Sequence, residues 1–380
     1  MGSELIFKFI LLILLVVGVL LVQAYLFGKF SGRKVTYSIS FSTEQAYEGD
    51  DIFIIETLEN KKFLPVIWMR AEITTSKWLD FAGHKSDVTH ESRFVTSNFF
   101  LWGNQKITRK WFVKCLKRGI YKIDSAMLVW GDLFGLKNNN LPIEVSTKLT
   151  VYPTPGDNDI IASRSNKIMG NILTKRWIND DPFVFSGVRK YNISDPMNRI
   201  HWKATAKAGE LMVRKNDYTT YPSFIMVLNV QSSDIDYKET MDKEEIEKLI
   251  KVAAALIDYA IKIKANFSLV SNGFNFNVPF EEEWEAINAD TKLSKEAKKK
   301  AIAKVIARNI VRGNGKEHAD AMLNYLASID LKIAVDYEYL LEEVFASNKN
   351  DMVVLLTPYR NDEINKLCET MSKKGRQVLY

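Results

Sequence analysis

Residues 185–215 read FSGVRKYNISDPMNRIHWKATAKAGELMVRK, the segment with the most complete start and stop signals in the chain. Asp195 is a residue type that caps helices, Pro196 suits the first helical position, and Gly209 suits the left-handed conformation that closes a helix. Asp195 and Arg199 lie four residues apart, so we expect the carboxylate to meet the guanidinium. The stretch predicts a capped helix followed by a short strand.

This stretch resembles the signature of the domain of unknown function 58 family of bacteria and archaea, whose pattern is approximately G-x-R-x-Y-x-x-G-D-x-x-R-x-I-x-W-K-x-T-A-[RK]. The chain matches the pattern at Gly187, Arg189, Tyr191, Asp195, Ile200, Trp202, Lys203, Thr205, Ala206 and Lys207, and Arg199 stands one position after the second arginine of the pattern. Ser194 stands where the family usually has glycine. Two upstream pieces also fit, RGIY at 118–121 and DLFGL at 132–136.

The resemblance covers nearly the whole chain and implies both an architecture and a partner. Family members typically carry N-terminal membrane helices, usually two where this chain shows one, then a β domain and a von Willebrand factor A-like α/β domain. Their biochemical activity is not established. By analogy with other A-like domains, the resemblance implies association with MoxR-type AAA+ ATPases.

Upstream of the signature, short alternating runs broken by turn residues predict antiparallel strands. The expected strands cover 35–41, 52–58, 66–74, 107–113, 121–129 and 143–152. A β-sandwich is the natural closure for such a set of strands. Pro153 and Pro155 mark the exit, and the polar residues 156–166 predict a linker or surface loop.

Downstream of the signature, strands alternate with helices, which predicts a doubly wound α/β sheet. The expected strands are 224–230, 267–270, 352–356 and 377–380, and the expected helices are 243–264, 318–329, 337–346 and 362–373. Between them, residues 281–312 are predicted to form a helical insertion.

The predicted fold class is therefore α+β multi-domain: an N-terminal transmembrane helix, an antiparallel β-sandwich domain, then a von Willebrand factor A-like doubly wound α/β domain. The predicted ranges are 1–34 for the anchor and its basic flank, 35–155 for the β-sandwich domain, 156–220 for the linker and signature motif, and 221–380 for the α/β domain.

The segment that begins at Leu5 and ends at Phe27 is almost continuously apolar, with Lys8 as its only charge. As a helix it would span about 34 Å, enough to cross a bilayer. A cleaved signal peptide has a shorter apolar region, of about 7 to 15 residues, so we favour an uncleaved anchor. A buried soluble helix would need a polar stripe, which this segment lacks.

The charges that flank the apolar segment predict its orientation. Lys29, Arg33 and Lys34 follow it directly, whereas residues 1–4 are nearly neutral apart from the α-amino group. The positive-inside rule then places the C-terminal bulk in the cytoplasm. We therefore expect a single-pass protein of the cell membrane with cytoplasmic domains.

Composition limits the classes of partner and cofactor. The formal charge is +6 on 98 charged side chains, too evenly mixed for a dedicated nucleic-acid binder. Cys115 and Cys368 lie far apart in different predicted domains, so no disulfide framework or cysteine-based metal site is expected.

A metal site of the A-domain type would need Asp-x-Ser-x-Ser after the first strand of the α/β domain. This chain has Asn229, Gln231 and Ser233 at those three positions. Replacing the leading carboxylate by an amide removes charge from a site for a hard cation, so we expect no bound metal and no cofactor. A nearby Asp234 or Asp236 would be the residue to rescue the site.

The basic residues of the signature stretch allow two interpretations. They would form an anion site for phosphate, lipid headgroup or nucleic acid, or the arginines would pair with Asp195, Asp180 or Asp181 and brace the domains. We favour bracing because capping and packing explain most of these residue types. The basic residues concerned are Arg189, Lys190, Arg199, Lys203, Lys207, Arg214 and Lys215.

Sequence signatures of enzymes are missing: there is no Gly-x-Ser-x-Gly, no phosphate loop and no His-Glu-x-x-His.

The leading hypothesis is a non-catalytic scaffold or adaptor that partners a MoxR-type ATPase or an envelope assembly. The alternative is an anionic lipid or nucleic-acid binding module that uses the basic stretch, and a hydrolase of unknown mechanism ranks last. The sequence does not set the oligomeric state.

Overall fold

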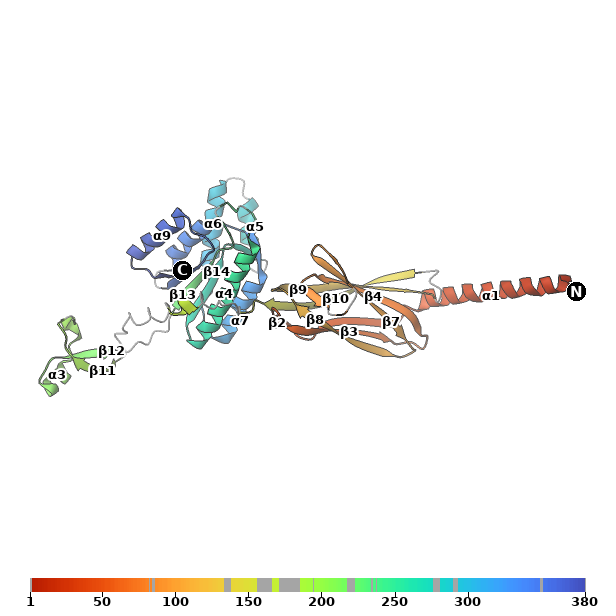
Figure 1. The fold of residues 1–380 in the computed structure, drawn as a ribbon, viewed down its shortest axis with the longest axis horizontal. Helices are drawn as coiled ribbons and strands as arrows, with labels where there is room; N and C mark the ends of the chain where they lie inside the picture. Colours follow the sequence, from red (N-terminus) through yellow and green to blue (C-terminus); the bar gives the residue numbers. More distant parts are fainter. Residues whose placement is uncertain are drawn as a thin grey trace. The chain divides into compact units, whose positions relative to one another are not determined.

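The computed structural model describes residues 2–81, 83, 86–132, 138–155, 166–170, 185–193, 195–216, 223–233, 235–236, 238–275, 281–289, 293–348 and 351–379. An N-terminal apolar helix, a sheet-rich domain and an α/β region follow one another along the chain, which confirms the predicted order (Figure 1). The chain divides into two compact units, Met1–Pro153 and Thr154–Tyr380. Residues 133–136, Asp180, Asp181, Ser194 and Asp234, named above, lie outside the described residues.

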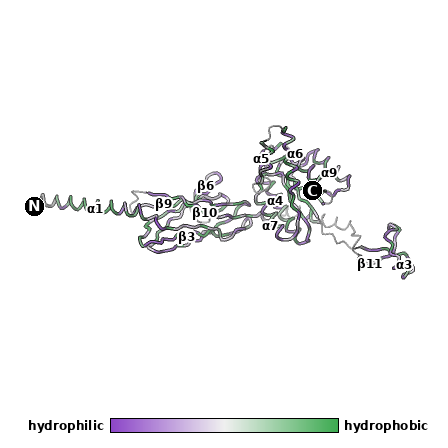
Figure 2. Tube along the Cα trace, turned by 180° about the vertical axis from the view of Figure 1, so that it is seen from behind, coloured by the Kyte–Doolittle hydropathy of each residue, from purple (hydrophilic) through white to green (hydrophobic). Residues whose placement is uncertain are grey.

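Helix α1 (Gly2–Phe30) contains the predicted apolar segment and extends it by a turn at its C-terminal end. Its stretch Ile6–Phe30 is long and apolar enough to cross a membrane, and none of its most apolar window is buried inside the protein. Figure 2 shows the same helix as hydrophobic along its length. The prediction of a helix able to span a membrane is confirmed at this level.

The sheet-rich domain consists of two sheets around one hydrophobic core. The first sheet has the order β1 (Val35–Phe41), β3 (Asp51–Asn60), β8 (Lys106–Cys115) and β5 (Leu79–Phe81). The second has the order β2 (Gln45–Tyr47), β10 (Asn138–Tyr152), β9 (Gly119–Gly131), β4 (Val66–Ser76), β7 (Ser92–Leu101) and β6 (Ser86–Thr89). Alternate residues of β3 are buried, including Ile54 and Leu58, as the period-two pattern predicts.

Strand β7 has no counterpart among the predicted strands, although it alternates regularly in the structure. Its inward residues are Val95, Ser97, Phe99 and Leu101, all buried against β4 and the opposite sheet. Ser97 interrupts the apolar period, and outward Phe94 and Phe100 add a second apolar series out of phase with the first. The tertiary core, and not the local pattern, selects the buried face.

Helix α1 ends against the sheet-rich domain through specific contacts. The Gly28 carbonyl accepts hydrogen bonds from Trp130 Nε1 at 3.4 Å and Asn139 Nδ2 at 3.0 Å. Gly32 lies so close to the Trp130 ring that an added Cβ would fall 2.3 Å from it. The Lys62 ammonium donates to the Ser31 carbonyl at 2.6 Å. The last turn of the helix is therefore held by the β domain.

The α/β region is built on a parallel sheet of order β14 (Asn266–Ser271), β13 (Ser223–Leu228), β17 (Met352–Leu356) and β18 (Val378–Leu379). Strand β15 (Gly273–Asn275) follows β14 directly and pairs antiparallel with β16 (Ile329–Ile333). The helices are α4 (Lys243–Lys262), α5 (Glu281–Ala289), α6 (Lys295–Arg308), α7 (Gly315–Ser328), α8 (Tyr337–Ser347) and α9 (Asp362–Lys373).

Helices cover the two faces of this sheet differently. Ile225 and Val227 of β13 share a hydrophobic cluster with buried residues of α6, α8 and α9. The intervening Phe224 and Met226 point to the other face, where α4 and α7 pack. Continuous burial of β13 on both faces explains its unbroken apolar sequence. The predicted insertion holds α5 and α6, the latter with Ile302 and Ile306 buried.

The signature stretch forms a small hairpin module, which we call the signature module (residues 185–216). Strand β11 (Phe185–Lys190) pairs antiparallel with β12 (Met212–Asn216). The 3-10 turn η1 (Met197–Arg199) and helix α3 (Trp202–Ala208) lie between the two strands in sequence.

The prediction of one helix capped by Asp195 is wrong. The chain is extended at Pro196 and again at Ile200, which bridges to Val213, so only a single turn forms between them. Helix α3 begins later, capped by His201 Nδ1, which accepts from the Ala204 amide at 3.1 Å. The prediction for Gly209 is confirmed, with φ of 72° at the end of α3.

Candidate functional site

Polar side chains gather at the carboxyl edge of the parallel sheet, where open α/β sheets bind ligands. Asn229 and Gln231 follow β13, Asn272 follows β14, and Thr357 follows β17. Asn229, Gln231 and Asn272 are almost completely buried. This edge is the first candidate site.

Asn272 is the centre of the hydrogen bonds at this edge. Its Nδ2 donates to Asn229 Oδ1 at 3.1 Å and to Gln231 Oε1 at 3.0 Å, and its Oδ1 accepts from the Val230 amide at 2.8 Å. Gln231 Oε1 also accepts from the Tyr337 amide at 3.0 Å. One side chain thus links the ends of β13 and β14 to the start of α8.

Asn229 completes the connection to β17. Its Nδ2 donates to Thr357 Oγ1 at 3.1 Å, and its Oδ1 also accepts from the Gln231 amide at 2.9 Å. The Thr357 hydroxyl in turn donates to the Tyr359 carbonyl at 2.7 Å. We call Asn229, Gln231, Asn272 and Thr357 the amide network, because amide groups satisfy one another here.

Ser233, the third residue of the degenerate metal run, belongs to a separate cluster around Asp236. Asp236 Oδ2 accepts from the Ser232 hydroxyl at 2.7 Å, and Oδ1 accepts from the Ser233 hydroxyl at 3.1 Å. Burial acts to raise the pKa of Asp236, but hydrogen bonds from Ser232, Met241 and Ser233 outweigh it and the pKa is lowered.

Asp236, named above as a residue to rescue a metal site, is therefore already bonded through both oxygens to Ser232 and Ser233. Among the described residues, no group of three or more His, Cys, Asp or Glu side chains is placed to hold a metal ion. That no metal ion binds at the carboxyl edge of the parallel sheet stays a prediction.

The signature module is the second candidate site, and its strongest polar contact joins Arg189 to Asp195. The guanidinium donates two hydrogen bonds of 2.6 Å to the two carboxylate oxygens. The Asn192 amide also donates to Asp195 Oδ2, at 2.9 Å. The hydrogen bonds from Arg189 and Asn192 lower the pKa of Asp195 to about 2. The predicted pairing of an arginine with Asp195 is present, and it lies within the module.

Other signature residues hold the module together. The Tyr191 amide donates to the Leu211 carbonyl at 2.8 Å, and the Thr205 hydroxyl accepts from the Met212 amide at 3.0 Å. Gly187 pairs with Lys215 in the hairpin. Much of the motif is therefore explained by the folding of the module itself.

Three large apolar side chains lie on the outside of the module. Ile193, Trp202 and Met197 have exposed fractions of 93%, 68% and 66%, whereas only Ile200 and Val213 are buried among its described side chains. We call Ile193, Met197 and Trp202 the apolar face of the module. Their exposure makes these three side chains candidates for an interaction site.

The module also concentrates charge. Residues 187–215 hold seven Lys and Arg against two Asp and Glu, an excess of five where the whole chain has a net charge of +6. Both acidic residues are paired, Asp195 with Arg189 and Glu210 with Lys190 at 2.8 Å. Lys203 and Lys207 of α3 are exposed and make no ion pair among the described residues. Half-buried Arg199 ends η1.

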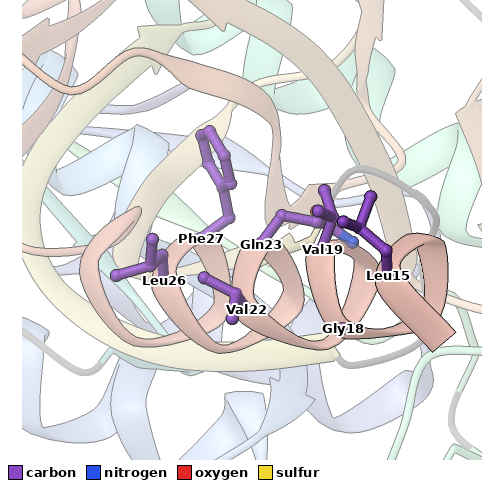
Figure 3. A pocket seen from close by; sticks show the side chains of 7 residues that line it. All are labelled: Leu15, Gly18, Val19, Val22, Gln23, Leu26 and Phe27. Carbon is purple, nitrogen blue, oxygen red and sulfur yellow. The ribbon is translucent and has the colours of Figure 1, made fainter. Parts of the chain in front are cut away.

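A third feature is a groove of about 400 Å³ along α1, shown in Figure 3. It is lined by Leu15, Gly18, Val19, Val22, Gln23, Leu26 and Phe27. Gly18 leaves room because it has no side chain, and every other lining residue except Gln23 is apolar. The groove holds no group for catalysis.

Sequence reasoning missed Asn272, the hydrogen bond of Thr357 to Asn229 and the capping role of His201. Asn272 and Thr357 had a usable signal, because each directly follows an apolar strand and parallel strands bring their carboxyl ends to one edge. His201 had none, since histidine is not among the favoured capping residues.

An apolar helix able to span a membrane, a sheet-rich domain and an α/β region together define a class of multidomain chain with a candidate membrane anchor. Residues 187–289 match the family described as "Protein of unknown function DUF58". The uncharacterized protein YeaD of Bacillus subtilis (strain 168) is 22% identical over 251 residues, which cover 66% of this chain and 59% of that protein. The chain thus spans less than two thirds of its relative's length. The two matches support a DUF58 protein.

Solved structures resemble parts of the chain only weakly. A non-cellulosomal cohesin from Archaeoglobus fulgidus is 11% identical, with a TM-score of 0.22, and the match covers 30% of this chain and 91% of the cohesin. The sporulation control protein Spo0M from Bacillus subtilis is 10% identical, with a TM-score of 0.21, covering 42% of this chain and 58% of Spo0M.

We predict that Asn272→Ala lowers the free energy of unfolding by about 3 kcal/mol, because it leaves the buried Val230 amide without its acceptor and removes one of the two hydrogen bonds accepted by each of Asn229 Oδ1 and Gln231 Oε1. Denaturant unfolding of the purified chain measures this change. Asn324→Ala is the matched control: that amide is exposed on α7 and donates only to the Asp320 carbonyl. Equal effects of the two substitutions would contradict the role of the network.

A second prediction concerns pH. Because the folded pKa of Asp195 is depressed to about 2, its contribution to the module is present above the ordinary carboxyl range near pH 4 and is lost as pH falls through about 2. Arg189→Gln should raise this pKa. As the pH is lowered, the Asn192 amide of the variant should therefore lose its protection from hydrogen exchange at a higher pH than in the unchanged chain. NMR-detected hydrogen exchange measures it, and Lys190→Gln, which breaks only an exposed pair, should leave the profile unchanged.

Proposed function

We propose that this chain is a membrane-anchored, non-catalytic adaptor whose signature module contacts a protein partner. The observation that carries the proposal is the apolar face, Ile193, Met197 and Trp202, exposed on a module that buries only Ile200 and Val213 among its described side chains. Exposed large apolar groups beside signature residues favour recognition.

Size supports this reading. A module of about 30 residues buries too little surface to be stabilised by its own core. Its internal hydrogen bonds, donated by Arg189 and Tyr191 and accepted by Thr205, fix the hairpin but do not involve the side chains of the apolar face. A partner that covers Trp202 would supply the missing burial, and aromatic residues are frequent centres of binding energy at protein interfaces.

The anchor and the flanking charges set where this contact would occur. Helix α1 would hold the chain in the cell membrane as a single-pass protein, and Lys29, Arg33 and Lys34 favour cytoplasmic placement of the domains. The family resemblance then points to a cytosolic MoxR-type AAA+ ATPase as the partner, or else to an envelope assembly.

The α/β region supports a von Willebrand factor A-like domain that acts without a metal. Its parallel sheet carries the run that includes Asn229, Gln231 and Ser233 at the carboxyl edge, where such domains bind a cation. Neutral amides bonded to Asn272 give this edge rigidity without a carboxylate for Mg²⁺. An adaptor needs a fixed surface more than a reactive centre.

The adaptor proposal predicts the outcome of affinity purification from detergent-solubilised membranes. The unchanged chain should recover an AAA+ ATPase or another stable partner, and Met197→Ser combined with Trp202→Ser should reduce its recovery at least about tenfold. Quantitative mass spectrometry of the eluates measures the ratio.

The control pair is Met241→Ser with Val311→Ser, two side chains of similar exposure at 75% and 62% outside the module. Recovery of no stable partner by the unchanged chain would count against an adaptor. Equal loss with the control pair would show that the apolar face is not the contact.

A second candidate function is binding of an anionic lipid or nucleic acid by the same module. The observation that favours it is the local charge excess of five, with Lys203 and Lys207 one turn apart on α3 and free of ion pairs among the described residues. Such a cluster would bind phosphates in a salt-dependent manner.

For this alternative, Lys203→Glu with Lys207→Glu should abolish binding to anionic liposomes or single-stranded DNA and should flatten its salt dependence. Co-sedimentation and fluorescence anisotropy measure the two ligands. Lys366→Glu with Lys373→Glu on α9 is the matched control, because both lysines are exposed and lie outside the module. Salt-insensitive binding that survives the first pair would reject the alternative.

A further inference from the structure

Two loops of the sheet-rich domain lie beside the end of α1, and we call them the helix-side loops (residues 61–65 and 102–105). The first joins β3 to β4, and the second joins β7 to β8. Strand β1 leaves the helix at Val35, which pairs with Asn60 at the end of β3. The antiparallel register therefore places the first loop at the helix end of the domain.

Hydrogen bonds fix these loops to the helix end. The Lys61 amide donates to the Lys34 carbonyl at 2.9 Å, and the Lys62 ammonium donates to the Ser31 carbonyl at 2.6 Å. The Asn60 amide group donates to the carbonyls of Leu64 and Trp102, both at 2.9 Å, and so ties the two loops together. These direct contacts fix the position of both loops along the axis of α1, next to its last turn.

The helix-side loops present large apolar side chains to the outside. Phe63 has an exposed fraction of 91%, and Trp102 one of 64%. Phe100, at 44% exposure, packs edge-on against Trp102 with ring centroids 5.1 Å apart. Loop tips of a water-soluble domain rarely carry a phenylalanine that is almost wholly exposed, so this patch requires an explanation.

The length of α1 explains why the helix-side loops expose apolar side chains. Its apolar stretch of 25 residues measures about 37 Å at 1.5 Å per residue, whereas the hydrocarbon core of a bilayer is about 30 Å thick. If the stretch enters the hydrocarbon at Ile6, its last turn and Ser31 emerge about 7 Å beyond the opposite boundary. That is the head-group layer, and the contacts with Lys62 bring the first loop to the same level.

The charges around the patch match this layer. Lys29, Arg33, Lys34, Lys61 and Lys106 are all exposed near the helix end. Lys29 and Arg33 lie over the Phe30 ring, at 5.8 Å and 5.0 Å from its centroid. Lysine and arginine beside tryptophan and phenylalanine are the composition of membrane–water interfaces, where cations meet lipid phosphates and the rings lie at head-group level.

We propose that the helix-side loops are a second membrane contact, in which Phe63 and Trp102 insert into the head-group layer of the phospholipid bilayer that α1 spans. The inference rests on the proposed anchoring by α1. The β domain then stands on the membrane surface, held by the helix at Gly28 and Ser31 and by the loops beside it.

The occupant is the bilayer and not a second copy of the chain or another protein. A spanning α1 brings lipid head groups to this patch without any further binding event, so the local concentration of that partner is always high. The exposed cations also repel a second copy of the same patch across a two-fold contact, whereas anionic phospholipid attracts them.

Site-specific fluorescence of the full chain in liposomes containing anionic phospholipid tests the inference. Both native cysteines are buried, so an aqueous-phase label attaches selectively to an introduced thiol. Lys61→Cys reports on the loops, and Glu44→Cys reports on the opposite end of β1, about 20 Å away. Leu15→Cys reports on the helix through its protection from reaction with the label in intact liposomes. Iodide quenching should be about threefold weaker at position 61 than at position 44.

Phe63→Ser with Trp102→Ser, added to Lys61→Cys, should raise quenching at position 61 to the value at position 44. Phe94→Ser is the matched control, since it removes an exposed ring of β7 about 25 Å from the loops and should leave quenching unchanged. Thermal unfolding of each variant confirms that the domain remains folded.

Equal quenching at positions 61 and 44, with Leu15→Cys protected, would overturn the second contact and leave the anchor intact. An unprotected Leu15→Cys would overturn the anchor and, with it, both this inference and the membrane part of the proposed function. Protection at position 61 that persists without Phe63 and Trp102 would also reject insertion of these rings.

Discussion

The most apolar window of α1, within the 25-residue stretch Ile6–Phe30, is not buried by the described part of the chain, and an apolar surface of this length is unfavourable in water. The helix satisfies its own backbone, which is the condition for crossing lipid. Its last carbonyls, at Gly28 and Ser31, accept hydrogen bonds from Trp130, Asn139 and Lys62 of the β domain. Helix α1 and the β domain therefore meet through specific contacts.

In the α/β region too, buried polar groups satisfy one another by hydrogen bonding. At the carboxyl edge of its sheet, an aspartate-rich run would need a cation to offset its charge, whereas Asn229, Gln231 and Asn272 offset one another as neutral amides. The buried edge is then stable by itself. Because an amide both donates and accepts, three of them close a network that three carboxylates would not.

The signature module combines an internally hydrogen-bonded hairpin with exposed apolar side chains on its surface. Arg189, Asp195 and Thr205 are used inside the module, so these motif positions serve folding. Trp202 and Lys203 face outward and contribute little to that fold. A single motif therefore holds residues of two kinds, and only those of the second kind are candidates for recognition.

The sequence alone determined the elements with a strong period or clear end signals: the apolar helix, most strands of the β domain and the helices of the α/β region. Helix α9 was predicted to the residue, because Asn361 and Asp362 start it and its apolar stripe is regular. The resemblance to the DUF58 family also came from local residues, since a motif is a local pattern.

Tertiary structure decided what depends on residues far apart in the chain. It selected β7 as a strand by pairing it with β4, interrupted the expected helix at Ile200 by bridging that residue to Val213, and brought Asn272 to Asn229. It also placed Phe63 and Trp102 beside the end of α1. The physical reason is the same in each case: burial and hydrogen bonding act between segments that no local period connects.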